Sequence, residues 1–145
     1  MNAVAEKLVI KRRFNASVEQ VYAAWTDAAQ MKRWFAPGAM TVPEAEADAR
    51  VGGRYRVRMS EGGSDGPFHT AGGVYREVLP NQRLVFTWQW EGSPLETVVT
   101  LEFKRLGANE TELSLTHEGF DGADTRDKHA QGWEGCLANL ETFLD

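Results

Sequence analysis

The 145-residue chain, with 42% hydrophobic and 26% charged residues, has an ordinary globular composition and is long enough to bury a core, so we expect residues 1–145 to form a single domain. Its formal net charge of −5 excludes nucleic acid as a main partner, because binding to phosphates requires a basic surface. No apolar run could span a membrane, the N-terminus resembles no signal peptide, and one cysteine excludes an internal disulfide, so we expect a cytoplasmic protein.

A strand and two short helices are predicted at the start of the chain. Residues 8–14, LVIKRRF, are predicted as the strand. Ser17 and Gln20 match a capping box, in which each side chain bonds the backbone N–H of the other, so a helix is expected to follow. A second capping signal at Asp27 begins another helix, which the Pro37–Gly38 pair ends.

Between about residues 41 and 118 the apolar period is two residues, which is typical of strands with one buried face. Turn signals separate the runs, so we expect an antiparallel meander. The residues expected to face inward are Tyr55, Val57, Met59, Leu84, Phe86, Trp88, Trp90, Val99, Leu101, Phe103, Leu113, Leu115 and His117.

Two segments of this meander invite functional readings. EGGSDGPFHTAGG is glycine-rich, but it opens no helix as a phosphate loop would, so we interpret it as a flexible hairpin. Arg54, Arg56 and Arg58 alternate along one strand and are interpreted as a solvated strand face, with an anion site there as the weaker alternative.

The period returns to that of a helix after Asp124, which we predict as the N-cap of a helix running to Asp145. Its apolar face is expected to contain Arg126, His129, Ala130, Trp133, Cys136, Leu137, Leu140 and Leu144. Gly132 borders this face, whereas Gly135 points away from it without an evident reason. Each interior glycine costs a helix roughly 1 kcal/mol relative to alanine.

These elements together predict an α+β fold. A curved antiparallel sheet would wrap around the long C-terminal helix, with the two short helices placed after the first strand. Because a strongly curved sheet and a helix seldom meet flush along their whole length, we expect a cavity between them, bordered by aromatic side chains.

Six blocks carry a family likeness, in order along nearly the whole chain: FNASVEQVYAAWTDAAQMKRWFAP, DARVGGRYRVRM, GGVYREVLPNQRLVFTW, TLEF, TELSLTHEGF and HAQGWEGCLANLETFL. Together they resemble the small bacterial proteins named activator of heat-shock-protein-90 ATPase homologues. Those belong to the START-like (SRPBCC) superfamily, with the polyketide cyclases and the birch-pollen-allergen type. The resemblance implies a helix-grip fold with an internal cavity for apolar or amphipathic ligands.

The resemblance also bears on partners. The eukaryotic co-chaperone that gives the family its name has a separate N-terminal domain, for which 145 residues leave no room, so heat-shock protein 90 is not expected as a partner. An uncovered edge strand would allow a homodimer.

Metal and nucleophile chemistry find little support in the sequence. His69, His117, His129 and Cys136 lack the spacing of a ligand set, so we expect neither a metal nor another cofactor. Cys136 could pair with His129 or His117 as thiol and base, but a lone cysteine on an apolar stripe is more often a small buried hydrophobe.

We therefore expect a module that binds a small apolar or amphipathic ligand, and we assign no catalytic residue. The alternatives are a cyclase-like or hydrolase-like enzyme that uses His117 or His129 as acid or base, and a chaperone-interaction module. Some of the aromatic candidates are expected to be plain core. The residues predicted to bind the ligand are Trp34, Met59, Phe86, Trp88, Trp90, His117, Phe120, His129, Trp133 and Cys136.

Overall fold

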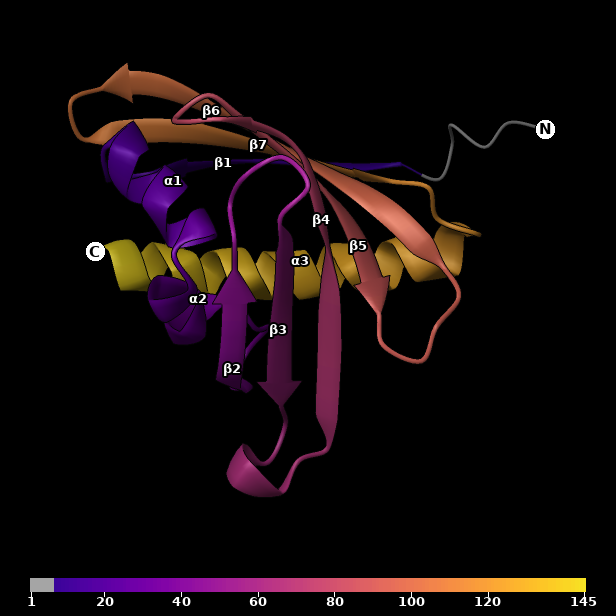
Figure 1. The fold of residues 1–145 in the computed structure, drawn as a ribbon. Coiled ribbons are helices and arrows are strands. Elements are labelled where there is room, and N and C mark those ends of the chain that lie inside the picture. Colours follow the sequence, from indigo (N-terminus) through magenta and orange to yellow (C-terminus); the bar gives the residue numbers. More distant parts are fainter. Residues whose placement is uncertain (1–6) are drawn as a thin grey trace.

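One curved sheet and one long helix dominate the structure, a computed structural model that describes residues 7–145. The elements in chain order are β1 (Leu8–Phe14), α1 (Val18–Thr26), α2 (Ala28–Trp34), β2 (Thr41–Ala47), β3 (Arg54–Ser60), β4 (Phe68–Leu79), β5 (Arg83–Trp90), β6 (Glu96–Gly107), β7 (Glu110–Glu118) and α3 (Ala123–Leu144). The seven strands lie in the order β1-β7-β6-β5-β4-β3-β2, and all neighbours are antiparallel. Figure 1 shows them curling around α3.

The predicted α+β helix-grip architecture is confirmed, with two short helices after the first strand and a long C-terminal helix against the sheet. Residues 1–6 lie outside the described range, and they are part of the segment in which no signal peptide was expected. Within residues 7–145, no helix is both long and apolar enough to cross a membrane.

The two short helices begin where local chemistry places them. The capping box of α1 is complete, because Gln20 N donates to the Ser17 hydroxyl at 3.2 Å and Ser17 N donates to the Gln20 side chain at 2.9 Å. Asp27 ends α1 and caps α2 through a bond from Ala29 N at 3.1 Å. The turn between the helices therefore needs no additional residues.

The predicted hairpin EGGSDGPFHTAGG is wrong in extent. Its second half, from Phe68, belongs to the long strand β4. Position 73 requires a glycine because β4 comes very close to β5 there. A Cβ on Gly73 would lie 2.1 Å from the Thr87 carbonyl oxygen. This close approach is a long-range feature, which local sequence does not reveal.

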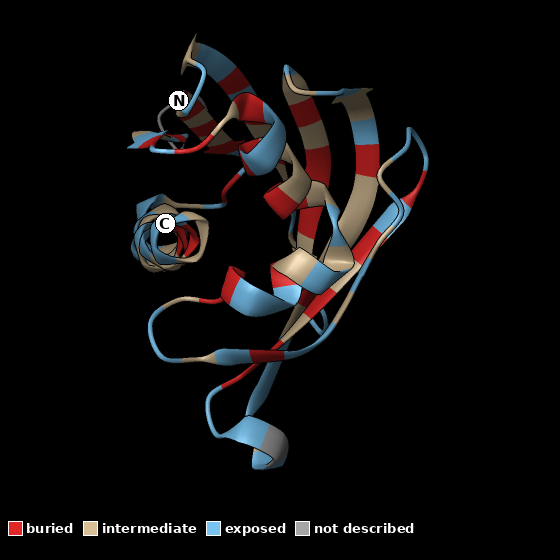
Figure 2. Ribbon diagram, turned by 90° about the vertical axis from the view of Figure 1, so that its left-hand side faces the viewer, coloured by how far each residue is buried: buried red, intermediate tan, exposed pale blue. Residues whose placement is uncertain are grey.

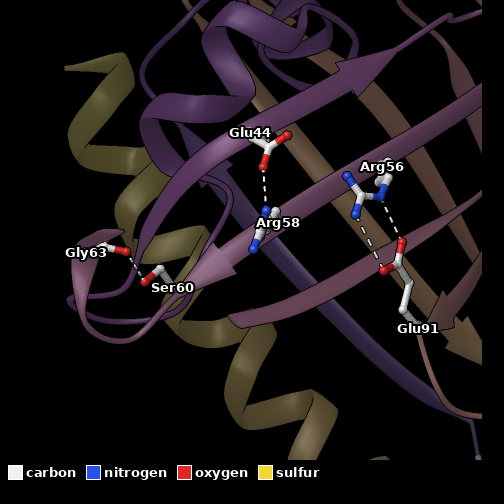
Figure 3. Close-up of polar contacts among 6 residues, drawn as sticks. All are labelled: Glu44, Arg56, Arg58, Ser60, Gly63 and Glu91. Atoms are coloured by element: carbon white, nitrogen blue, oxygen red, sulfur yellow. Dashed lines mark hydrogen bonds and ion pairs between the residues drawn. The ribbon is translucent and has the colours of Figure 1, made fainter. Parts of the chain in front are cut away.

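The arginines of β3 do not form a free basic face. Arg56 Nε lies 2.7 Å from a Glu91 carboxylate oxygen, and Arg58 Nη1 lies 2.7 Å from one of Glu44 (Figure 3). The same view shows Ser60 donating to the Gly63 carbonyl in the loop that follows β3. Because two of the three arginines are already neutralised by carboxylates, the alternative of an anion site on this face loses its main support.

The predicted N-cap of α3 is also wrong. The helix starts at Ala123 and its N-cap is Gly122, whose carbonyl accepts from Arg126 N at 3.2 Å. Asp124 instead lies in the first turn, where its negative charge interacts favourably with the positive end of the helix dipole. The helix begins earlier than the polar signal suggested because Gly122 itself supplies the first backbone acceptor.

The core lies between the concave face of the sheet and α3. Figure 2 looks along α3 and shows its buried residues on the side toward the sheet, while buried residues recur as bands along the strands. Leu137 and Leu140 of α3 are buried at this interface, as are Leu84, Leu101 and Leu115 of the central strands. This half of α3 fixes the position of the rest of the helix relative to the sheet.

Candidate functional site

A pocket of about 270 Å³ lies between the N-terminal half of α3 and strands β3 and β5. Its lining is almost wholly apolar and comes from four parts of the chain. The lining residues are Pro37 after α2, Met59 of β3, Trp88 and Trp90 of β5, and Lys128, His129, Gly132, Trp133 and Cys136 of α3. An apolar concave site with few polar groups is the usual form of a small-molecule site.

The two glycines of α3 explain why the helix leaves a gap at one point and closes tightly at another. A Cβ added to Gly132 would meet no atom within 4 Å, so this position borders open space. A Cβ on Gly135 would lie 3.1 Å from both Gly38 N and Pro37 Cβ. Gly135 thus lets the helix touch the loop that carries Pro37, a contact that could not be inferred from the local sequence.

Asn139 attaches that loop to the helix. Its Nδ2 donates to the Ala36 carbonyl at 2.7 Å and to the Gly38 carbonyl at 2.9 Å. The loop after α2 is hydrogen-bonded to Asn139 and packs against Gly135, so Pro37 has a defined position at the pocket. The wall formed by this loop is therefore a fixed part of the site.

His117 is fully buried on β7 and bonds the residues behind the pocket to one another. Its Nδ1 accepts from the Trp133 indole N–H at 3.0 Å, so the proton of the neutral ring is on Nε2. Nε2 then donates to the Thr97 hydroxyl at 2.6 Å, and that hydroxyl donates to the Trp88 carbonyl at 3.2 Å. Burial, helped by the nearby His129, lowers the pKa of His117 to about 3, so the ring is neutral at pH 7.

His129 makes a second, separate pair of bonds. Its Nε2 accepts from the Trp90 indole N–H at 2.9 Å, which requires Nε2 to be unprotonated. The other nitrogen, Nδ1, then carries the proton and donates to the Thr125 carbonyl at 2.8 Å. The ring lines the pocket, but both of its nitrogens are engaged. In this arrangement neither His129 nor His117 has a nitrogen free to exchange a proton with a bound molecule.

Cys136 lines the pocket as a protonated thiol. Burial raises its pKa to about 12, because a thiolate would lose its hydration there. A thiol at this pKa is a poor nucleophile near pH 7. The geometry therefore places Cys136 as a small apolar wall residue, consistent with the simpler of the two readings of the sequence.

One buried nitrogen of the lining side chains has no partner in the described part of the chain. Trp88 is 4% exposed, and its indole N–H makes no hydrogen bond within the described part of the chain. Trp25 has the same deficit, but it belongs to α1 and does not line the pocket. A buried donor without an acceptor costs about 1–3 kcal/mol, and because this nitrogen has almost no accessible surface, a bound molecule would reach it only after the Trp88 side chain moves.

The structure places the predicted ligand-binding residues in two groups. Met59, Trp88, Trp90, His129, Trp133 and Cys136 line the pocket, whereas Trp34, Phe86, His117 and Phe120 do not. Trp34 packs against Trp25 with ring centroids 4.7 Å apart, and Phe86 packs against Tyr55 at 5.2 Å.

Phe120 and His117 lie behind the lining. Their ring centroids are 4.4 Å apart, and the Phe120 ring is 5.0 Å from that of His129. Both support the wall without reaching the pocket. They are placed there because β7 and the segment after it pass behind the side chains of α3 that form the lining.

Three lining residues, Pro37, Lys128 and Gly132, were not among the predicted ligand-binding residues, although Gly132 was expected to border the apolar face of the helix. Pro37 appeared only as a helix-ending signal, and Lys128 was not among the residues expected on the apolar face of α3. The one available signal for Lys128 was its position beside His129 in the sequence. Within residues 7–145, no cluster of three or more histidine, cysteine, aspartate or glutamate side chains is placed to hold a metal ion.

Comparison with known proteins gives one family. The model of the family described as activator of Hsp90 ATPase homolog 1-like protein matches residues 15–145. No curated protein matches the chain.

Several solved structures are similar over almost the whole chain. Protein CV1439 from Chromobacterium violaceum is 28% identical with a TM-score of 0.83, covering 95% of this chain and 96% of its own. The AHSA1 protein SPO3351 from Silicibacter pomeroyi is 25% identical with a TM-score of 0.83, covering 94% and 95%. CalU16 from Micromonospora echinospora is 28% identical with a TM-score of 0.72, covering 96% and 76%.

Proposed function

The chain belongs to the activator of Hsp90 ATPase homolog 1-like family, and on that premise we propose that it is a single-domain module that binds a small apolar or amphipathic molecule between α3, β3 and β5. The observation that carries the proposal is the apolar pocket beside Gly132. Its volume of about 270 Å³ exceeds that of a cavity of roughly 150 Å³ that binds benzene. One- or two-ring molecules are therefore of suitable size.

The lining supports binding by burial of apolar surface. Trp88, Trp90 and Trp133 present large aromatic surfaces to the pocket, and Met59 adds a flexible side chain that adapts to different shapes. Each Å² of apolar surface removed from water contributes about 25 cal/mol. The hydrogen bonds that hold Trp90 and Trp133 in place keep this surface preformed.

Acid–base catalysis has less support from the same residues. His117 lies behind the lining with a pKa of about 3, and His129 uses both ring nitrogens in bonds within the protein. A general acid or base works best with a pKa near the working pH and with a nitrogen that reaches the substrate. The arrangement favours binding over proton transfer.

The test is a titration with neutral aromatic probes, acetophenone and 2-acetylnaphthalene, followed by tryptophan fluorescence and calorimetry. We expect saturable binding with quenching. Gly132→Leu places a side chain in the open space and should weaken binding by about tenfold or more. Gln131→Leu is the matched control, because it adds the same side chain at an exposed position next along α3 and should bind like the wild type.

Both variants are first checked for cooperative unfolding in urea. The proposal is rejected if neither probe binds the wild type at millimolar concentration. It is equally rejected if folded Gly132→Leu binds the probes as tightly as Gln131→Leu.

A further inference from the structure

We propose that the pocket selects an anion: a small aromatic or aliphatic carboxylate whose apolar part lies against the tryptophans and whose charged group meets the Lys128 ammonium at the rim. This inference rests on the proposed function and adds the charge of the ligand to it. The observations that carry it are the hydrogen-bond inventory of the lining and the position of Lys128.

The acceptors of the lining side chains are already used. His129 Nε2 accepts from Trp90, and its Nδ1–H donates to a backbone carbonyl. Among the nitrogen and oxygen atoms of the lining side chains that the structure describes, two remain unpaired: the buried indole N–H of Trp88 and the ammonium of Lys128. A ligand that brings an acceptor meets the exposed ammonium at the rim, whereas a ligand that brings only donors finds no free nitrogen or oxygen acceptor among these side chains.

The charges of the lining side chains also favour an anionic ligand. Lys128 is the one permanently charged side chain among the lining residues, and no carboxylate lines the pocket. Lys128 is exposed and makes no ion pair within residues 7–145, in contrast to Arg56 and Arg58 on the outer face of the sheet. A carboxylate at the pocket rim can therefore approach the ammonium without displacing a protein partner.

Two features oppose an anion, and they limit the size of the effect. The net charge of the chain is −5, and Asp124 lies one helical turn before Lys128. Charges farther away than about 8–10 Å are largely screened at physiological salt, so the net charge acts weakly at the rim. An exposed ion pair contributes little, so the expected preference for the anion is about two- to fivefold.

The experiment compares three probes of similar shape: 2-naphthoate, neutral 2-acetylnaphthalene and 2-naphthylmethylammonium. The ketone keeps an oxygen acceptor, so the difference between it and the carboxylate isolates the charge. We expect the wild type to bind the carboxylate most tightly and the ammonium least tightly. Raising the salt concentration should reduce the preference for the carboxylate and leave ketone binding unchanged.

Lys128→Met keeps the apolar stem and removes the charge. It should abolish the preference for the carboxylate, measured as the ratio of carboxylate to ketone affinity within the same variant. Lys104→Met, an exposed lysine on β6, is the matched control and should retain the preference. Equal binding of ketone and carboxylate by the wild type, or a preference that survives Lys128→Met, overturns the inference while the proposed function stands. Failure of all three probes overturns both.

Discussion

The two halves of α3 face the same sheet but differ in how they meet it. Within residues 137–144, Leu137 and Leu140 pack into the core and are no more than 1% exposed. The half before them, from Ala123 to Cys136, borders the pocket. Close packing is the normal state of a protein interior, so the packed half needs no functional explanation, whereas the open half does.

The halves also differ in polarity. The open half meets the sheet through tryptophan–histidine pairs, Trp133 with His117 and Trp90 with His129. The packed half meets it through leucines, with Asn139 attached to the loop after α2. A hydrogen-bonded ring holds its orientation even where packing on one side is missing, whereas a leucine depends on neighbours on every side. The polar pairs therefore keep the pocket wall in place without filling the pocket.

The largest expected effect is in the packed half. Leu140→Ala removes a fully buried side chain and leaves a cavity, so the free energy of unfolding should fall by about 3 kcal/mol. Urea denaturation measures this change. Leu144→Ala, a half-buried leucine one turn later, is the control and should cost about 1 kcal/mol or less. Similar losses at both positions would show that the packed half is not the anchor described.

The next effect is a pH dependence that belongs to the open half. The pKa of His117 is about 3 in the folded protein and about 6.5 when unfolded, so the unfolded chain binds the proton more readily. Stability from this residue is complete above pH 6.5 and is lost as the pH falls toward 3. Each pH unit in this window costs about 1.4 kcal/mol, so lowering the pH from 7 to 5 should cost about 2 kcal/mol.

Urea titrations at several pH values, performed on the wild type and on His117→Phe, isolate this contribution. Carboxylates in ion pairs, such as Glu91, add a slope of the same sign to both proteins, so the difference between the two slopes reports on His117. The variant loses stability at pH 7, because Trp133 N–H is left without its acceptor, but its slope between pH 7 and 5 should be shallower. Parallel slopes would mean that His117 is not buried in its neutral form.

Local signals were sufficient for much of the fold. The capping box of Ser17 and Gln20 involves residues three apart, and the alternation of Tyr55, Val57 and Met59 follows from the two-residue period of a strand. Features that depend on distant segments were missed. Gly73 lies within a strand because Thr87 approaches it, and Gly135 lies in a helix because the loop around Gly38 packs against it.

The candidate site divides in the same way. Periodicity indicated that Trp88, His117 and His129 all face the interface between helix and sheet. It did not indicate which of them lines the pocket. That depends on where α3 diverges from the sheet, and the divergence places His129 on the pocket and His117 behind it. Lys128 was missed because helical spacing describes the direction of a residue, whereas a long side chain can reach beyond its own face.

The smallest effects come from the two glycines, and they separate the open half from its junction with the loop. Gly132→Ala adds a methyl group in open space, so it should stabilise the protein by about 0.5–1 kcal/mol through helix propensity. Gly135→Ala gains the same propensity, but its methyl group would lie 3.1 Å from Gly38 N in a loop that Asn139 holds in place. The steric cost should cancel the gain or exceed it.

Urea denaturation and titration with 2-acetylnaphthalene distinguish the two variants by their stability and by the size of the loss in binding. Gly132→Ala should be more stable than the wild type but bind the probe more weakly, because the new methyl group occupies part of the pocket. Gly135→Ala should be no more stable than the wild type and should weaken binding less than Gly132→Ala, because its methyl group pushes on the lining residue Pro37 but does not itself enter the pocket. If both variants were stabilised equally with unchanged binding, the open half would be no different from any other helix surface. A gain in stability at Gly132 with a loss of binding would instead indicate that this glycine is retained for the space it leaves.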